Sequence, residues 1–178
     1  MSAWLRVALG ECAQLTLRGE IPDPDRTYRL VGVRWWGEGA YEYRQVSGAE
    51  TQAPQLFSVE EGDLLINKIW ARHGSIAVAD GSMAGAFGSA EFPTFVLDRN
   101  RVDPRFMHWF SKTPLAWLQC ERLSQGTSGK NRVKPERFLT IQVPLPPLDE
   151  QRRIVERLDG AAARVEARSQ AAAGVERE

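Results

Sequence analysis

A cluster of prolines near residue 145 divides the chain into two parts of different character. The segment PLPPL, residues 144–148, holds three prolines that cannot lie together inside a helix or a central strand. It is therefore expected to run as an extended connector. After it there is no proline, alanine and arginine dominate, and Asp149 and Glu150 stand where a helix N-terminus favours negative charge. The sequence predicts a globular domain over residues 1–147 and one long helix over residues 148–178.

The predicted C-terminal helix carries a narrow apolar stripe. Its members follow one another at alternating steps of four and three, the spacing of a coiled-coil seam: Ile154, Leu158, Ala161, Val165, Arg168, Ala172 and Val175. The arginine and the two alanines weaken this seam. A helix of about thirty residues would be about 45 Å long, and its stripe cannot be buried against a body that lies behind its own first turn. The apolar members Ile154, Leu158, Ala161, Val165 and Val175 are therefore expected to pack on a partner helix.

The rest of the chain predicts a mixed α+β fold that is rich in strands. The expected strands run from Tyr28 to Trp36, Asp63 to Trp70, Ser75 to Ala79 and Thr94 to Asp98, with glycine-bearing turns between them. Asp103 and Thr113 each precede a proline, which is the pattern of a capped helix start. Short helices are therefore expected over Pro104–Ser111 and Pro114–Leu123. A final apolar run, Phe138 to Val143, is expected to close the sheet or to pack beside it.

Composition indicates a globular protein without a strong overall charge. Hydrophobic residues make up 43% of the chain, and 23 Lys and Arg balance 23 Asp and Glu, so any attraction to nucleic acid must come from local clusters. Cys12 and Cys120 are too few for a disulfide framework or a tetrahedral zinc site, and are expected to be small buried residues. The N-terminal residues lack the features of a secretion signal. A reducing cytoplasm is the expected location.

The first candidate DNA-binding group is the loop before the last apolar run. Between Glu121 and Arg137 basic residues outnumber acidic ones by five to two. Hydroxyl and amide side chains interleave with them, and such groups bind phosphates and base edges. The candidates are Thr127, Ser128, Lys130, Asn131, Arg132 and Lys134. The alternative is an ordinary solvated loop.

Two further candidate groups lie upstream. Adjacent side chains on a strand point to opposite faces, so one of Trp35 and Trp36 is expected in the core. The other would then lie beside Arg34 and Arg44, where its ring is a candidate for contact with a sugar or a base. Arg34 and Trp36 are the candidates of this group. The third group is expected at a strand end and in its loop: Asn67, Lys68, Arg72 and His73. Packing in the core is the alternative for the tryptophan.

No catalytic pattern emerges from the sequence. Gly129 and Lys130 suggest a phosphate-binding loop, but the required following Ser or Thr is replaced by Asn131. His73 and His108 have no accompanying pattern of cysteine or carboxylate ligands that would form a metal site. The sequence therefore predicts no catalytic residue, no metal and no cofactor.

One stretch resembles a known family closely. Residues 126–159, GTSGKNRVKPERFLTIQVPLPPLDEQRRIVERLD, are similar to the end of a target recognition domain and the start of the spacer helix in type I restriction-modification specificity subunits. The diagnostic order is the GTS loop, an apolar run, PLPPL, and then Glu150 and Gln151 followed by RIV. Upstream, EGDLLINKIWARHGSIAVAD at residues 61–80 looks like a strand and loop of the same domains, and SAWLRVALGECAQL is similar to their usual start.

The resemblance implies a DNA-reading role without catalysis. Complete members carry two recognition domains, each of which reads half of a two-part DNA site, while antiparallel spacer helices set the distance between the halves. This sequence holds one such unit. Separate modification subunits would methylate adenine with S-adenosylmethionine, and separate restriction subunits would cleave unmethylated DNA. Mg and ATP would likewise belong to those partners. Two alternatives remain: a recognition domain of another phage-defence methyltransferase, and a protein-interaction module that acts through its coiled coil.

Overall fold

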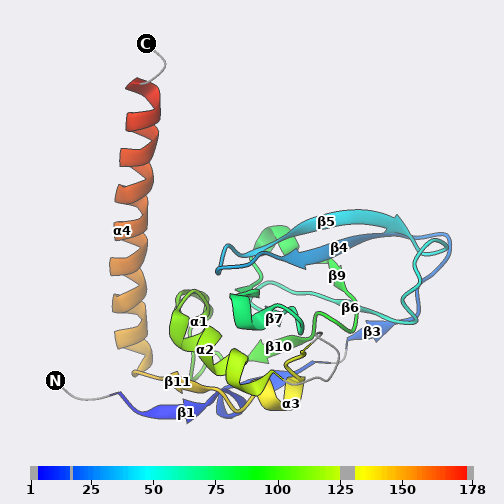
Figure 1. The fold of residues 1–178 in the computed structure, drawn as a ribbon, viewed down its shortest axis with the longest axis horizontal. Helices are drawn as coiled ribbons and strands as arrows, with labels where there is room; N and C mark the ends of the chain where they lie inside the picture. Colours follow the sequence, from blue (N-terminus) through cyan, green and yellow to red (C-terminus); the bar gives the residue numbers. More distant parts are fainter. Residues whose placement is uncertain (1–3, 17, 125–130, 176–178) are drawn as a thin grey trace.

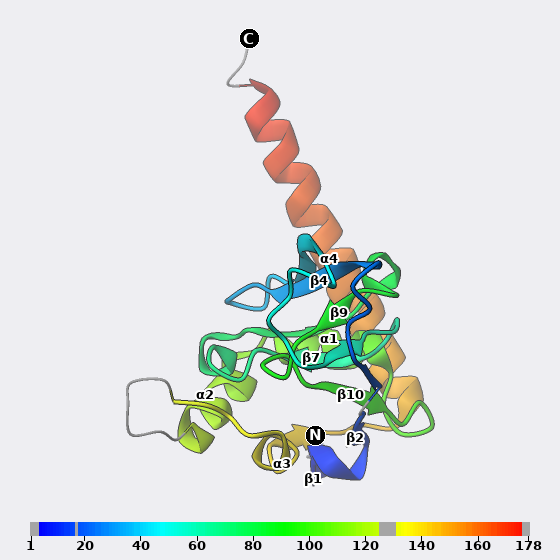
Figure 2. The same cartoon turned by 90° about the vertical axis from the view of Figure 1, so that its right-hand side faces the viewer.

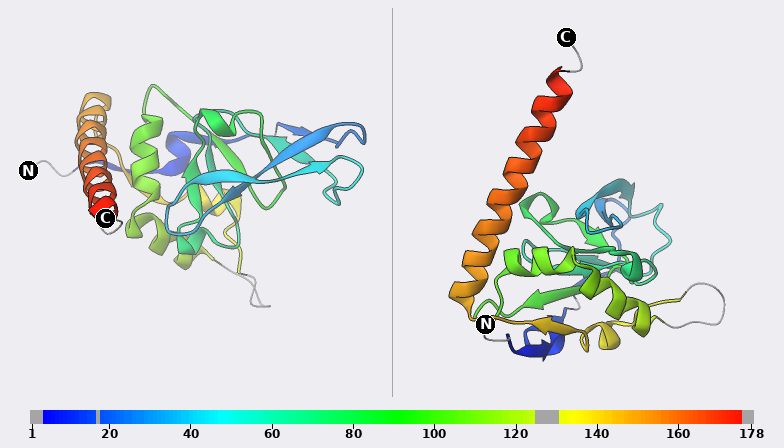
Figure 3. Two further views of the ribbon diagram at one scale, coloured as in Figure 1. Left: turned by 90° about the horizontal axis from the view of Figure 1, so that it is seen from above. Right: turned by 60° about the vertical axis from the view of Figure 1, so that its left-hand side comes forward.

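One long helix, α4 (Leu148–Val175), stands beside a strand-rich body and continues well past it (Figures 1 and 2). The structure is a computed structural model that describes residues 4–16, 18–124 and 131–175, and side chains as far as residue 172. Seen from above, α4 lies at one edge of the body, next to α1 (Figure 3). The mixed α+β fold with a long C-terminal helix is therefore confirmed.

The largest sheet of the body has the strand order β3-β6-β9-β4-β5. Its strands are β3 (Gly19–Glu20), β4 (Thr27–Val33), β5 (Ala40–Ser47), β6 (Leu56–Ser58) and β9 (Phe87–Gly88). β4 and β5 form a long antiparallel hairpin with an irregularity between Leu30 and Val31, whereas β4 pairs with β9 in parallel. This hairpin is the most extended feature of the body (Figure 1).

A second sheet has the order β2-β10-β7-β8 and occupies the middle of the body. Its strands are β2 (Ala13–Leu15), β7 (Leu64–Ile66), β8 (Ile76–Val78) and β10 (Thr94–Leu97). Alternate residues of β7 face different neighbours, since Leu64 and Ile66 join the main core with the helices while Leu65 packs with Val31 and Val33 of β4. The middle sheet is thus buried on both faces, between the helices and the five-stranded sheet.

The two ends of the body meet in a third, two-stranded sheet. β1 (Arg6–Ala8) pairs in antiparallel fashion with β11 (Gln142–Pro144). Short 3-10 helices follow β1, β7 and β8: η1 (Leu9–Glu11), η2 (Ala71–His73) and η3 (Gly81–Met83). Because β11 runs directly into the proline segment, the β1–β11 pair fixes the point from which α4 departs.

The predicted helices α1 (Pro104–Ser111) and α2 (Pro114–Leu123) begin and end where the sequence placed them. Asp103 Oδ1 accepts a hydrogen bond from the backbone N–H of Arg105 at 2.8 Å, and Thr113 Oγ1 accepts one from Ala116 at 3.3 Å. Both caps satisfy backbone donors that a helix start leaves unpaired.

Several strand predictions need correction. The strand expected to reach Trp36 ends at Val33, because the chain turns there with positive φ angles. The strand expected to reach Trp70 ends at Ile66, because the Asn67 side chain caps a turn by accepting the N–H of Ile69 at 3.0 Å. The apolar run that starts at Phe138 is divided between the one-turn helix α3 (Pro135–Phe138) and β11. Strand β5 was not predicted from the sequence.

Both cysteines are buried in the main core, as predicted. Burial raises the pKa of the Cys12 thiol to about 11 and that of the Cys120 thiol to about 12. Because of these raised pKa values, both thiols remain protonated at neutral pH. Since the thiolate is the reactive form, both side chains act as small apolar groups.

The first three turns of α4 pack against the body, and the rest is exposed. Val155 is 2% exposed, and Ile154 packs against the same core. Asp159 Oδ1 accepts a hydrogen bond from Trp109 Nε1 at 2.8 Å, and Asp159 also forms an ion pair with Arg105. From residue 162 to residue 172 every side chain is exposed. Among the helices of the described residues, none is both long and apolar enough to span a membrane.

Candidate nucleic-acid interface

The turn between β4 and β5 carries two exposed tryptophans. Trp36 has a φ of 58°, and Gly37 and Gly39 follow with φ of 70° and 95°. Trp35 and Trp36 are 44% and 57% exposed. The expectation that one of the pair lies in the core is therefore wrong, because the chain leaves the sheet before it reaches them.

Backbone contacts hold this turn against the segment around η2. The N–H of Trp36 donates to the carbonyl of His73 at 2.8 Å, and the N–H of Gly37 donates to the carbonyl of Gly74 at 2.9 Å. Gly37 and Gly74 let neighbouring segments lie close to the backbone, because neither carries a Cβ. A Cβ at Gly37 would lie 2.9 Å from Lys112 Cα, and one at Gly74 would lie 2.6 Å from the Trp117 ring. Segments distant in sequence are thus fixed side by side.

An aromatic cluster results from this docking. We define it as Trp35, Trp36, Trp70, His73 and Trp117. The ring centroids of Trp35 and Trp70 are 4.8 Å apart, those of Trp36 and His73 are 5.9 Å apart, and those of Trp36 and Trp117 are 5.8 Å apart. Trp117 Nε1 also donates to the carbonyl of Ser111 at 2.8 Å. The cluster therefore presents π faces at a surface in fixed orientations.

Three basic side chains are held by aromatic rings in or near this cluster. The guanidinium of Arg34 lies 4.3 Å from the centroid of the Tyr41 ring. Arg72 Nε donates to His73 Nε2 at 3.1 Å. Lys112 Nζ lies 5.5 Å from the Trp109 ring centroid. The predicted residues Trp36, Arg72 and His73 are thus brought together, although they come from two separate groups of the sequence.

A second basic group forms around one carboxylate. Lys68 Nζ lies 3.6 Å from Glu91 Oε1, and Arg132 Nε lies 3.1 Å from Glu91 Oε2. The backbone N–H of Val133 donates to the carbonyl of Lys68 at 2.8 Å, which holds the residues after the basic loop beside β7. Two cations share one anion, so the group keeps a net positive charge.

The basic loop is described only at its C-terminal end. Asn131 is partly buried and Lys134 is exposed at the start of α3. The candidates Thr127, Ser128 and Lys130 lie outside the described residues, so their part in DNA binding stays a prediction.

The candidate partner-binding residues of α4 fall into two classes. Ile154 packs on the chain's own body, which the stripe alone did not indicate. Leu158 and Val165 are 36% and 68% exposed, and Ala161 is partly buried. The side chain of Val175 lies outside the described part of the chain.

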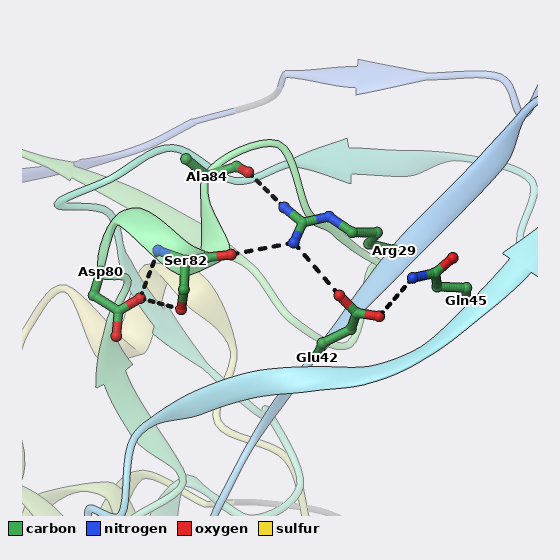
Figure 4. A network of polar contacts seen from close by, with 6 residues as sticks. All are labelled: Arg29, Glu42, Gln45, Asp80, Ser82 and Ala84. Carbon is green, nitrogen blue, oxygen red and sulfur yellow. Dashed lines mark hydrogen bonds and ion pairs between the residues drawn. The ribbon is translucent and has the colours of Figure 1, made fainter.

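A polar network fastens the β4–β5 hairpin from its other side (Figure 4). Arg29 donates to the carbonyls of Ser82 at 3.2 Å and Ala84 at 2.6 Å, and lies 3.4 Å from a Glu42 oxygen. Hydrogen bonds from Ser82 lower the pKa of Asp80, in spite of some desolvation. Because this network joins η3 to both strands of the hairpin, it fixes the direction of the turn that carries the tryptophans.

Glu91, Lys112 and Trp117 were not predicted as site residues. Each meets the predicted residues through a contact between segments distant in sequence, so no local pattern marked it. Within the described residues, no group of three or more His, Cys, Asp or Glu side chains could hold a metal ion. The arrangement is therefore suited to binding, with aromatic faces and cations at one surface.

One known family matches nearly the whole chain. A family model described as Type I restriction modification DNA specificity domain matches residues 1–177. No curated protein matches the chain.

Several solved structures are similar to the chain in fold. The HsdS subunit from Thermoanaerobacter tengcongensis is 21% identical with a TM-score of 0.74, over 93% of this chain and 43% of that chain. A structure titled for the assembly and conformational transition of the type I R-M system is 22% identical with a TM-score of 0.71, over 94% and 44%. The S subunit from M. genitalium is 16% identical with a TM-score of 0.60, over 92% and 40%. The chain thus spans less than half the length of each of these chains.

Proposed function

The chain belongs to the family of type I restriction modification DNA specificity domains, and from this membership we propose that it reads one half of a two-part DNA site. Specificity domains of this family are non-catalytic and carry no cofactor. Methyl transfer from S-adenosylmethionine to adenine and ATP- and Mg-dependent cleavage would belong to the modification and restriction subunits. The complex would work in the cytoplasm, where the DNA lies.

One observation supports the DNA-reading surface above all others. Trp36 and His73, distant in sequence, are joined by a backbone hydrogen bond, and Arg72 donates to the His73 ring. Arg34 precedes the two tryptophans, with its guanidinium over the ring of Tyr41. Exposed tryptophans are costly in water and are usually kept for a partner. Arginines supply phosphate contacts and read guanine in the major groove. We propose that this surface meets the duplex, with Lys68, Arg132, Lys134 and the loop that carries Thr127, Ser128, Lys130 and Asn131 on its flank.

We further propose that the chain consists of two parts with different roles, divided at residue 147. Residues 1–147 would recognise DNA, and residues 148–178 would act as the spacer that meets another helix. Leu158 and Val165 are exposed, and every side chain from residue 162 to residue 172 is exposed as well, so burial of these two apolar side chains requires a partner. The partner would be a second recognition half or a second copy of this chain.

A titration of DNA affinity against salt tests the recognition surface. The full chain is tested, alone and with its modification subunit, on duplexes selected from a random library. Removing a cation that pairs with one phosphate should reduce the slope of log K against log salt by about 0.9. The double substitution Arg34→Ala with Arg72→Ala should therefore lower the slope by about 1.8. The matched control is Arg153→Ala with Arg164→Ala, two exposed arginines of α4. A slope that is unchanged in the first variant would remove this surface from the DNA interface.

The spacer is tested by the mass of the particle in solution. Val165→Glu places a charge on the stripe and should shift the chain towards the monomer in light scattering. Ala163→Glu, on the same exposed turn but off the stripe, is the control and should change nothing. A mass that stays monomeric at high concentration in the unmodified chain would exclude self-association and leave only a second recognition half as partner.

A further inference from the structure

A cleft of 590 Å³ opens between the β4–β5 hairpin and the segment after β5. It borders the aromatic cluster, since Trp35 and Trp70 belong to both. Its volume falls in the range of about 300 to 1,000 Å³ that is typical of small-ligand sites. Nothing in the duplex-binding role described above requires such a cavity.

Aromatic rings form the walls of this cleft. Trp35 and Trp70 stand on one side with ring centroids 4.8 Å apart, while Tyr41 and Tyr43 come from β5 with centroids 6.5 Å apart. The ring of Tyr41 lies directly on the backbone of Gly32, where an added Cβ would come within 2.6 Å of it. Tyr43 is 60% exposed at the opening. Flat faces in fixed positions are suited to stack on a planar ring.

Several polar side chains that line the cleft carry hydrogen-bond donors. Asn67 Oδ1 accepts the backbone N–H of Ile69 at 3.0 Å and that of Trp70 at 3.4 Å, so the orientation of this amide is fixed. Asn67 lines the cleft, and its Nδ2 has no hydrogen-bond partner among the described residues. Arg44 and Ser89 add further donors. No carboxylate from the described part of the chain lines the cleft.

These features fit a nucleobase better than other small planar ligands. The ring faces are satisfied by stacking, and the carbonyl oxygens at a base edge match the donors of Asn67 and Arg44. The absence of a carboxylate among the described lining residues keeps the cleft compatible with the phosphate that accompanies every nucleotide. Because the cleft adjoins the surface proposed to meet the duplex, a base rotated out of the stack would reach it without leaving the interface.

We propose that this cleft binds a single unstacked nucleobase of the target DNA, held between the aromatic walls and hydrogen-bonded through Asn67. The inference rests on the proposed function, since it takes the duplex to be bound at the neighbouring surface. Rotating a base out breaks its stacking and pairing, and the cost is smallest for a base that is already unpaired. A base without a partner should therefore increase affinity.

The test compares one duplex in two forms, fully paired and with one unpaired thymidine at its centre. Fluorescence anisotropy with the full chain should show binding about tenfold tighter to the bulged form, which corresponds to about 1.4 kcal/mol. Tyr43→Ala should abolish most of this preference and Tyr43→Phe should keep it. Trp4→Ala removes another exposed aromatic ring, outside the cleft, and should leave the preference intact. Equal affinity for both forms, with the paired duplex bound, would overturn the inference and leave the proposed function standing.

A second arm uses thymidine monophosphate alone and reads the tryptophan fluorescence. Quenching that Tyr43→Ala abolishes would support a nucleobase site even if no duplex is bound, in which case the proposed function fails and a free nucleotide is the source of the base. Absence of quenching together with equal duplex affinities would eliminate the site.

Discussion

Gln151, in the first turn of α4, accepts a hydrogen bond from the backbone N–H of Asp103 at 2.9 Å with its Oε1. Its Nε2 donates to the carbonyls of Arg101 at 2.9 Å and Pro146 at 2.7 Å. The side chain is completely buried. One amide thus ties the spacer helix, the proline segment and the start of α1 together, and it sets the direction in which α4 leaves the body.

Gln151→Leu should destabilise the body strongly. The substitution keeps the volume but leaves one buried carbonyl, one partly buried carbonyl and one partly buried N–H without this partner. An unsatisfied buried group costs about 1 to 3 kcal/mol. The free energy of unfolding in urea should fall by about 2 to 4 kcal/mol. Gln170→Leu, on the exposed part of the same helix, should change it by less than about 0.5 kcal/mol. Equal stabilities of the two variants would contradict the assigned role.

Asp159→Ala should loosen the last packed turn of α4 without unfolding the body. The carboxylate accepts the indole N–H of Trp109 at 2.8 Å, a partly buried hydrogen bond worth about 1 kcal/mol. Its ion pair with Arg105 is more exposed and adds little. Hydrogen exchange of the backbone over residues 156–162 should become several times faster. An exchange pattern identical to that of the unmodified chain would show that packing alone holds this turn.

Glu91→Gln should strengthen DNA binding. Glu91 neutralises one of the two cations Lys68 and Arg132, so its carboxylate competes with phosphate for them. The slope of log K against log salt should become steeper by about 0.9 for each cation released to a phosphate. Glu121→Gln, an exposed acid on α2, is the control for a general change in net charge. If both variants behave alike, the shared carboxylate has no particular role.

Trp36→Gly should weaken DNA binding while stability changes little. A residue other than glycine at a φ of 58° costs about 1 to 2 kcal/mol, and glycine relieves that strain while it removes the ring that packs against Trp117 and His73. The two effects oppose each other, so the midpoint of thermal unfolding should move by only a few degrees. Affinity for the duplex should fall severalfold. A large drop in stability with unaltered DNA affinity would make Trp36 a packing residue.

His108 should make the chain less stable in mild acid. Burial lowers its pKa below the ordinary 6.5, repulsion by Lys112 lowers it further, and Asp159 and Asp80 only partly oppose this. Between the folded and unfolded pKa values the unfolded chain binds more protons, so stability rises with pH in that window. The penalty therefore appears as the pH falls below about 6.5 and is complete below the folded pKa. Urea unfolding between about pH 5 and pH 8 should show this slope, and His108→Gln should flatten it.

Local patterns in the sequence determined the elements whose signals lie within a few residues. The proline segment, the Asp103 and Thr113 caps and the acidic start of α4 act through neighbouring backbone groups, so α1, α2 and α4 appear where these signals predict them. The family resemblance could also be found from the sequence, because its diagnostic motifs lie within a short stretch on both sides of the proline segment.

The tertiary structure alone decided which candidates meet. The residues around Trp36 do not predict its contact with His73, and those around Lys68 do not predict that it shares Glu91 with Arg132. These contacts depend on strand pairing and on two glycines that let backbone segments approach. The extent of β4 was also decided there, since a turn with positive φ ended the strand before the tryptophans and placed both at the surface. Long-range contacts bring together residues whose separation in sequence carries no information, and the DNA-reading surface proposed here consists mostly of such contacts.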